Sequence, residues 1–292
     1  MGIKTAERSI MKALSDEQVA SFRRDGFLSP FPLLGEEELA ACNAGVSRFE
    51  SWLGAPINGD SAHKWRSMAY LILPWVARLA QDPRILGPVK DLLGPNLLIF
   101  TSTFFIKEAN SPTIAAWHQD STYYGLEPKE EVCVWIALTE ADDRAGCMEA
   151  LSFAGRPHQL RHASRVVENS VNRGSQMIVE PIDETDPVAM PLPAGSFSMH
   201  HGLCVHRSGP NKSSHRRIGL GLNFIPTHVR PSGSVRHAAM LVRGEDRYGH
   251  FELVGPPKDE LDRDAVATHA HAMALYRDAY LEEEERHARL SV

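Results

Sequence analysis

The sequence lacks long apolar runs and closely spaced cysteines. No uninterrupted apolar stretch reaches membrane-spanning length, and the first residues, MGIKTAERSIMKAL, lack the apolar segment of a signal peptide. The four cysteines, Cys42, Cys133, Cys147 and Cys204, form no CxxC pair, which argues against a disulfide framework or a zinc site. We therefore expect a cytoplasmic protein with reduced thiols and no membrane partner.

Runs of basic residues are absent as well. The chain has 31 Lys and Arg against 37 Asp and Glu, for a formal net charge of −6. This balance argues against nucleic acid or an anionic membrane surface as the main partner. It favours a small-molecule substrate, and nothing in the sequence indicates an oligomeric state.

Helix signals fill the region of about residues 15–95. The capping-box pattern Ser15-Asp16-Glu17-Gln18 predicts a helix that stops at Gly26. A further helix is expected from Pro83 to Leu93, before Gly94-Pro95. Between these helices, apolar residues at helical spacing predict one buried stripe made of Leu39, Cys42, Val46, Phe49 and Leu53.

Strand signals follow the helical region. The segment Glu131 to Thr139 is apolar on both faces, as in a buried central strand, and residues 218–224 alternate apolar side chains with Gly or Asn. A charged pattern over about residues 258–289 predicts a solvated terminal helix. Helices followed by many short strands predict a mainly β fold, a sandwich or barrel with flanking helices, in a single domain over residues 1–292.

The segment Trp117-His118-Gln119-Asp120 is the first candidate for a chemical site. Residues two apart on a strand share a face, so His118 and Asp120 would aim an imidazole and a carboxylate at one point. Ferrous iron in oxygenases takes two His and one carboxylate and keeps the opposite positions open. The alternative is a simple surface pair, because H-x-D is common by chance.

A second cluster of polar residues begins at His206. Arg217 follows eleven residues later and opens the alternating strand, where an inward-pointing Arg is costly unless it pairs with an anion. Its planar guanidinium suits a carboxylate bound through two hydrogen bonds. Strand alternation sends the adjacent Arg216 to the other face.

Three segments, WHQDSTYYG, VWIALTEADDRAGCM and PAGSFSMHHGLCVHRSGPNKSSHRR, together resemble the phytanoyl-CoA dioxygenase family of Fe(II)/2-oxoglutarate-dependent oxygenases. The resemblance runs from about Leu14 to Arg247, and it is closer to the bacterial branch, which is similar to 2-aminoethylphosphonate hydroxylases and natural-product tailoring enzymes. Its most specific element combines H-x-D, H-x-S-x-x-N and the Arg eleven residues after that His. It implies a double-stranded β-helix, the cupin-like jelly roll, with helices packed outside.

The resemblance also implies Fe(II), 2-oxoglutarate and O2 as cofactor and co-substrates. His118, Asp120 and His206 match the iron ligands at the catalytic centre. The residues implied to bind 2-oxoglutarate are Arg217 for the distal carboxylate, Ser208 as a hydrogen-bond partner, the pocket aromatic Trp135, and Lys107, whose role stays open.

His200 and His201 are rival candidates for metal binding. In the family, a His-Gly pair precedes the distal ligand without binding metal, which favours a structural role for His201. Arg207 stands where the family usually has a small residue. It can point to solvent or reach an anionic substrate.

The reaction implied is hydroxylation of an unactivated C–H, with 2-oxoglutarate decarboxylated to succinate and CO2. Asp120 fills the position that related halogenases leave open for chloride, which favours hydroxylation, whereas desaturation and ring closure stay open. A metal-dependent hydrolase and a non-catalytic jelly-roll binding protein are the alternatives, and a hydrolase has no need of Arg217.

Substrate contacts are expected from tyrosines. Tyr123 and Tyr124 follow the H-x-D pair and should lie near the pocket mouth, while Tyr70 belongs to a segment that could form a lid. Each of these side chains has core packing as its alternative role. The bacterial resemblance favours a small, polar or zwitterionic substrate.

Overall fold

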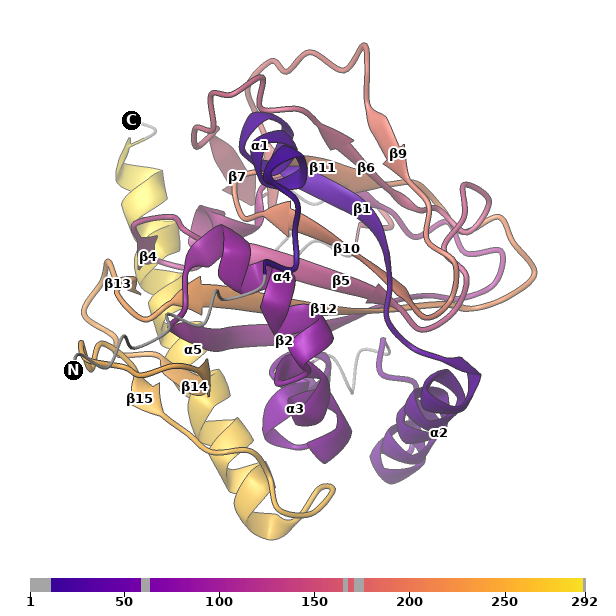
Figure 1. Ribbon diagram of the computed structural model, residues 1–292, viewed down its shortest axis with the longest axis vertical. Helices are drawn as coiled ribbons and strands as arrows, with labels where there is room; N and C mark the ends of the chain where they lie inside the picture. The colour runs from indigo at the N-terminus through magenta and orange to yellow at the C-terminus, as the bar shows by residue number, and fades with distance from the viewer. Residues whose placement is uncertain (1–11, 59–63, 165–167, 171–175, 291–292) are drawn as a thin grey trace, which may run out of the picture.

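The computed structural model describes residues 12–58, 64–164, 168–170 and 176–290. Within these ranges, two mainly antiparallel sheets face each other, and most of the helices pack on the outer side of the larger sheet (Figure 1). This is the two-sheet arrangement of a jelly roll with flanking helices, as the sequence predicts. No helix in the described ranges is both long and apolar enough to cross a bilayer.

The larger sheet contains seven strands, and every neighbouring pair is antiparallel except β14 and β15. Their order is β1 (Phe27–Pro32), β10 (Ser196–His201), β5 (Val132–Ala137), β12 (Arg217–Pro226), β2 (Leu97–Lys107), β14 (Ala238–Arg243) and β15 (Glu252–Leu253).

The smaller sheet contains four strands in the order β3 (Ala115–His118), β11 (Val205–Ser208), β6 (Met148–Leu151) and β9 (Val188–Met190). Two short antiparallel pairs complete the described strands: β4 (Leu126–Glu127) with β13 (Arg230–Pro231), and β7 (His162–Ser164) with β8 (Gln176–Ile178).

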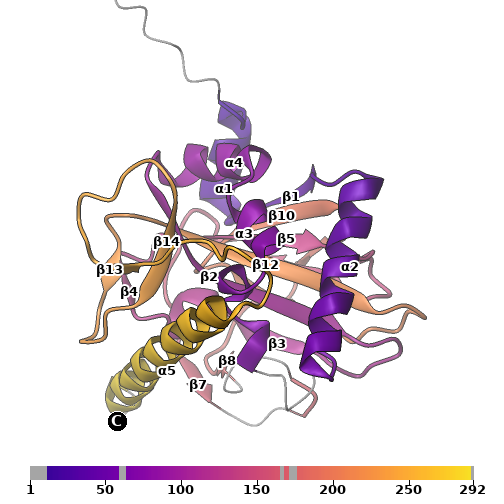
Figure 2. The same ribbon diagram turned by 90° about the horizontal axis from the view of Figure 1, so that it is seen from below.

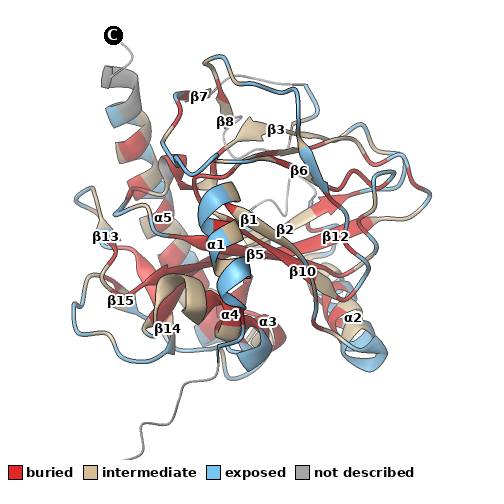
Figure 3. Cartoon of the chain, turned by 45° about the horizontal axis from the view of Figure 1, so that its top comes forward, coloured by how far each residue is buried: buried red, intermediate tan, exposed pale blue. Residues whose placement is uncertain are grey.

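The central strands β5 and β12 are buried along their whole length (Figure 3). On β12, Leu220 and Leu222 point into the core shared with the helices, while Gly219 and Gly221 face the smaller sheet side. Burial on both faces explains why Glu131 to Thr139 is apolar without alternation, as predicted for a central strand.

Four helices lie within the N-terminal region: α1 (Asp16–Asp25), α2 (Glu36–Leu53), α3 (Pro74–Ala80) and α4 (Pro83–Leu93). The capping box of α1 and the stop at Gly26, where φ is 89°, are confirmed, as are the ends of α4. The predicted stripe of α2 buries Cys42, Val46 and Phe49 against the core. In the view of Figure 2, α2 lies to the right and α5 to the lower left.

One strand in the N-terminal region was not foreseen. The segment Phe27–Pro32 forms β1, which pairs with β10 at the edge of the larger sheet. Proline is tolerated there because an edge strand does not need every backbone N–H for pairing. The pairing partner lies far along the chain, so local sequence patterns gave no sign of it.

The C-terminal helix α5 (Arg263–Leu290) begins where the side chain of Asp262 accepts a hydrogen bond of 2.8 Å from the Ala265 backbone N–H. The expectation of a solvated helix is wrong. Ala272, Tyr276 and Ala279 are buried against the core, so this helix is part of the packed structure.

Candidate active site

A cavity lies between the two sheets and is lined by residues from both of them. The larger sheet contributes side chains from β2, β5, β10 and β12, and the smaller sheet contributes side chains from β3, β6 and β11. His118, Asp120, His206 and Arg217 all line this one cavity. Residues separated by about a hundred positions in the sequence therefore meet at a single site.

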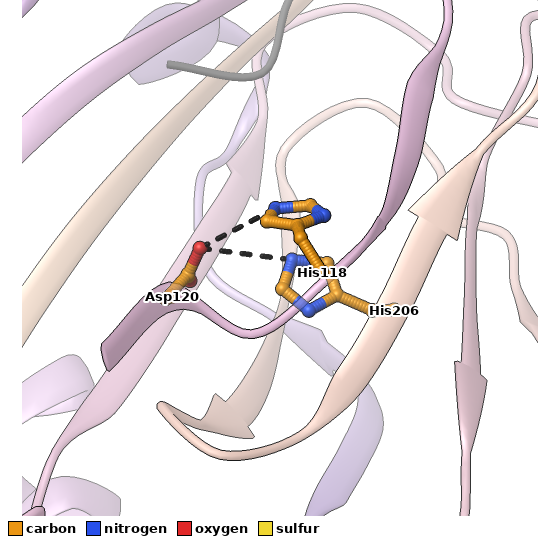
Figure 4. A group of neighbouring side chains, drawn as sticks. All are labelled: His118, Asp120 and His206. Carbon is orange, nitrogen blue, oxygen red and sulfur yellow. Dashed lines mark ion pairs between the residues drawn. The ribbon is translucent and has the colours of Figure 1, made fainter. Parts of the chain in front are cut away.

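His118, Asp120 and His206 converge on one point in this cavity (Figure 4). His118 on β3 and His206 on β11 are direct partners in the antiparallel pairing, and their ring centroids are 4.1 Å apart. The Oδ1 atom of Asp120 lies 3.5 Å from His118 Nε2 and 3.8 Å from His206 Nε2. Donor atoms at this spacing can all bind one metal ion that forms bonds of about 2.1 Å.

The route by which Asp120 reaches the site differs from the prediction. Strand β3 ends at His118, and Asp120 begins the short 3-10 turn η3 (Asp120–Tyr123). The pair therefore converges because the chain turns after His118, and strand alternation is not the reason. The backbone N–H of Ser121 donates to Gly202 O at 3.0 Å, which ties this turn to the loop that leads into β11.

Backbone carbonyls fix the orientation of both imidazoles. His118 Nδ1 lies 2.8 Å from Ala116 O, and His206 Nδ1 lies 2.9 Å from Cys204 O. A carbonyl can only accept, so each Nδ1 carries the proton and each Nε2 presents a lone pair to the cavity. Metal-binding histidines commonly have this arrangement.

The charges at the triad also suit a cation. Burial, together with the neighbouring His118, holds the pKa of His206 well below its usual range, so its imidazole is neutral at neutral pH. Burial raises the pKa of Asp120, but the neighbouring His206, His118 and His200 outweigh it and keep that pKa well below its usual value. Two imidazoles and one carboxylate form the donor set of a non-haem ferrous site.

Arg217 lies at another part of the same cavity, at the start of β12. It is 4% exposed, its guanidinium lies 5.4 Å from the Trp135 ring centre, and it donates to the Gly146 carbonyl. Its Nε is buried without a hydrogen-bond partner, and no carboxylate in the described ranges pairs with it. Burial lowers the pKa of Arg217 to about 10. A buried cation of this kind fits an anionic ligand.

Lys107 adds a second buried nitrogen beside Arg217. The two residues are direct partners in the pairing of β2 with β12. Lys107 Nζ donates to Ser208 Oγ at 2.7 Å and to the Gly209 carbonyl. Burial, and next the charge of Arg217, lower the pKa of Lys107 to about 6. Lys107 therefore reaches the cavity through Ser208, which lines it.

Arg216 points to the opposite face of β12, as alternation predicts. It forms ion pairs with Glu50 at 2.6 Å and with Glu108 at 2.9 Å. The outward Arg216 is thus paired with two carboxylates of the protein, whereas the inward Arg217 keeps a buried Nε without a hydrogen-bond partner among the described residues.

The tyrosines predicted near the substrate occupy three different situations. Tyr124 lines the cavity, where burial raises its pKa well above the usual value. Tyr70 is fully buried in the core and its hydroxyl lies 3.4 Å from Phe100 O, so the expectation that it contacts substrate is wrong. The side chain of Tyr123 lies outside the described part of the structure.

Two further tyrosines at the cavity come from α5 and were missed by sequence reasoning. Tyr276 and Tyr280 line the cavity together with Arg66 and Ser67 from the segment before α3. Tyr276 recurs at helical spacing with the buried Ala272 and Ala279, which is the signal that could have identified a packed face of α5. This end of the cavity combines hydroxyl groups, aromatic rings and one guanidinium.

Comparison with known proteins decides the family. A family model described as "Phytanoyl-CoA dioxygenase (PhyH)" matches residues 22–219, which is more than half of the chain. The chain belongs to the phytanoyl-CoA dioxygenase family. The matched range contains both histidines and the aspartate of the triad, and also Arg217.

Two curated relatives are named as dioxygenases of small molecules. A probable alpha-ketoglutarate-dependent hypophosphite dioxygenase of Stutzerimonas stutzeri is 25% identical over 179 residues, covering 60% of this chain and 62% of that protein. The ectoine dioxygenase of Bordetella parapertussis is 30% identical over 153 residues, covering 48% of this chain and 49% of that protein. The chain thus matches about half to three fifths of the length of these relatives.

Solved structures match over more of the chain. The apo form of the non-heme monooxygenase ThoJ superposes with a TM-score of 0.80 at 29% identity, covering 92% of this chain and 99% of that one. CytC3 with Fe(II) and alpha-ketoglutarate has a TM-score of 0.62 at 22% identity, covering 82% and 93%, and it shares the fold. These likenesses confirm the jelly roll.

Arg207 departs from the usual family pattern of a small residue after the distal His. Its guanidinium lies 4.5 Å from the Trp117 ring centre and pairs with Glu149 at 2.6 Å and Glu184 at 3.2 Å. Two carboxylates therefore already pair with this arginine, so an anionic substrate is not needed to explain it.

His200 and His201, the two rival candidates for metal binding, have different environments. His201 packs its ring edge-on against Phe153, and its Nδ1 accepts a hydrogen bond of 3.0 Å from Leu203 N–H, which fits a structural role. His200 lines the cavity, and its Nε2 lies 3.0 Å from Asp120 Oδ2. The sequence offers His200 as a possible ligand, whereas its contact with Asp120 depends on the tertiary structure.

Proposed function

We propose that this chain is an Fe(II)- and 2-oxoglutarate-dependent dioxygenase that hydroxylates an unactivated C–H of a small, polar or zwitterionic molecule. The overall change is R–H + O2 + 2-oxoglutarate → R–OH + succinate + CO2. One observation carries the proposal: a two-His-one-carboxylate triad and a buried, unpaired Arg217 line the same cavity. Metal ligands and a carboxylate-binding cation are the two halves that this chemistry needs.

In this proposal, His118, Asp120 and His206 hold the iron, which supplies the oxidation chemistry when bound. Arg217 pairs with the distal carboxylate of 2-oxoglutarate, and the Ser208 hydroxyl donates a hydrogen bond to it. Lys107 donates a hydrogen bond to Ser208 and holds it in place, while Trp135 forms a wall beside Arg217.

The substrate is assigned to the end of the cavity formed by Tyr124, Tyr276 and Arg66. Hydroxyl and guanidinium groups there can hydrogen-bond a polar molecule, and the aromatic rings can cover its carbon skeleton. The names of the hypophosphite and ectoine dioxygenases support a small polar substrate. We also assign the chain to one domain, because α5, both sheets and the N-terminal region all contribute to this cavity.

The test is an anaerobic titration of the metal-free protein with Fe(II) and 2-oxoglutarate. We expect the weak visible charge-transfer band of an iron–2-oxoglutarate chelate, and we expect its loss in His206→Ala but not in the neighbouring His201→Gln. Metal binding without the band in the wild type would contradict the co-substrate assignment and favour a metal-dependent hydrolase. Absence of metal binding would favour a non-catalytic binding protein.

A further inference from the structure

His200 occupies a fixed position beside the metal-binding triad. It lies on β10, inside the larger sheet, in register with Cys133 of β5 and Phe27 of β1. The residue is 1% exposed, and its ring centre is 4.6 Å from that of His206. A side chain held in the middle of a sheet has little freedom to move away from the cavity.

The two carboxylate oxygens of Asp120 have different neighbours. Oδ1 faces the Nε2 atoms of His118 and His206, at 3.5 and 3.8 Å. Oδ2 faces His200 Nε2 at 3.0 Å, which is hydrogen-bond distance. The carboxylate is therefore divided, with one oxygen turned to the metal position and the other turned to His200.

The hydrogen-bonding environment of His200 indicates which of its ring nitrogens carries the proton. Its Nδ1 is buried and has no hydrogen-bond partner among the residues that the structure describes. A proton on Nδ1 would leave a buried N–H unsatisfied, which is costly. The proton of the neutral ring is therefore best placed on Nε2, from which it is donated to Asp120 Oδ2.

We propose that His200 is a positioning residue that holds Oδ2 of Asp120 and so presents only Oδ1 to the metal. The inference rests on the proposed metal centre and deepens it. Binding through one oxygen leaves three positions of an octahedron free, which is the number needed for a two-atom 2-oxoglutarate chelate and O2. If Oδ2 were released, Asp120 could rotate on its turn or bind through both oxygens and occupy one of those positions.

The experiment compares three variants in the full-length protein. His200→Phe removes the donor and keeps a ring of similar size, and His200→Gln retains an N–H donor that reaches a similar distance. His201→Gln alters the next residue, which packs against Phe153 and does not line the cavity. Metal affinity is measured by competition of Co(II) with a chelating dye, and thermal unfolding of the metal-free proteins monitors folding.

We expect His200→Phe to weaken Co(II) binding by about 10- to 100-fold, the usual effect of losing a hydrogen bond to a metal ligand. His200→Gln should recover most of that affinity, and His201→Gln should bind like the wild type. In the anaerobic Fe(II) complex, His200→Phe should also need a several-fold higher 2-oxoglutarate concentration to reach half of the charge-transfer signal, because Oδ2 then competes for a coordination position.

Three outcomes would overturn the inference. His200→Phe could bind Co(II) with the same affinity as the wild type, or His200→Gln could bind Co(II) as weakly as His200→Phe. Either result would show that the hydrogen bond to Asp120 Oδ2 does not set the metal affinity. Sulfur-to-cobalt absorption that disappears in Cys133→Ser would place the ion on the alternative donor group Asp120, Cys133 and His200. If His200→Phe does not fold, the comparison of His200→Gln with His200→Asn, whose shorter amide falls short of Oδ2, takes its place. Failure of the wild type to bind metal would instead contradict the proposed function itself.

Discussion

At the scale of single residues, the two adjacent arginines of β12 show how environment separates chemical roles. Arg216 is paired with Glu50 and Glu108 on the outer face. Arg217 has the same side chain but faces the cavity, with its Nε unsatisfied. Because burial without a counter-charge is costly, Arg217 is the residue whose environment calls for an anion.

The substitution Arg217→Met tests this assignment. We expect 2-oxoglutarate affinity to fall by about 100-fold, since hydrogen bonds to charged groups contribute about 1.5–3 kcal/mol. Metal affinity in the absence of 2-oxoglutarate should stay close to that of the wild type. Calorimetric titration with 2-oxoglutarate in the presence of Co(II) measures the 2-oxoglutarate affinity, and titration with Co(II) alone measures the metal affinity.

The matched control is Arg216→Met. It should lower the melting temperature through its lost ion pairs and leave 2-oxoglutarate affinity unchanged. Arg217→Met, by contrast, removes an unpaired buried charge and should not lower the melting temperature of the metal-free protein. An equal loss of 2-oxoglutarate affinity in both variants would contradict the assignment.

At the scale of elements, close packing between β12 and β5 shapes the 2-oxoglutarate end of the cavity. A Cβ atom on Gly219 would lie 2.0 Å from Trp135 Cζ2, so only glycine allows the indole to lie across β12. Trp135 in turn lies beside the guanidinium of Arg217. The absence of one side chain on β12 therefore sets the position of a cavity wall.

We predict that Gly219→Ala displaces Trp135. Overpacking of this kind should lower the free energy of unfolding by about 1–3 kcal/mol, and 2-oxoglutarate affinity should fall as well. Chemical denaturation and 2-oxoglutarate titration are the measurements. Gly209→Ala is the control, because a Cβ there meets no atom within 4 Å. Wild-type stability of Gly219→Ala would show that the indole has room to move.

Glu131, directly before β5, is a buried acid that links this strand to β12 and η3. It is 1% exposed and accepts hydrogen bonds from Asn223 of β12 and, at 3.1 Å, from Ser121 of η3. Burial, and next the charge of Asp120, raise the pKa of Glu131 from 4.5 to about 8. Glu131 is thus a neutral, protonated group near neutral pH.

This raised pKa predicts a pH dependence of stability. Between pH 4.5 and about 8 the folded protein keeps a proton that the unfolded chain releases, so this contribution is complete below pH 4.5 and is lost as the pH rises through about 8. In metal-free protein, the stability of wild type relative to Glu131→Gln should therefore fall by up to a few kcal/mol over that range. Parallel pH profiles of the two proteins would refute the prediction.

At the scale of the whole molecule, the cavity depends on segments that only the complete fold brings together. The smaller sheet supplies His118 and His206, the larger sheet supplies Arg217, and α5 supplies Tyr276. A ligand that contacts all of these elements binds the folded state and not the unfolded chain. Such binding raises global stability by mass action.

We therefore predict that Fe(II) and 2-oxoglutarate together raise the melting temperature under anaerobic conditions. At a free ligand concentration of 100 times Kd the gain is about 2.7 kcal/mol. For a chain of 292 residues that corresponds to roughly 4–5 °C. Differential scanning fluorimetry measures it, with His201→Gln expected to respond like the wild type. A similar rise in His206→Ala would place the metal elsewhere.

The sequence alone determined the features that depend on neighbouring residues. The cap and stop of α1, the ends of α4 and the alternation along β12 follow from backbone hydrogen bonding and side-chain periodicity within a few residues. The candidate triad and Arg217 were also visible in the sequence, because their spacing matches a family pattern, and the structure brings them into one cavity.

Only the tertiary structure decided which distant side chains meet at that cavity. It pairs β1 with β10 and buries Tyr70 in the core, away from the cavity. It also brings Tyr276 of α5 to the cavity and places His200 next to Asp120, 80 positions away in the sequence. The physical reason is that these contacts arise from sheet pairing and packing between elements far apart in the chain. Local propensity and periodicity carry no information about which remote surface an element will cover.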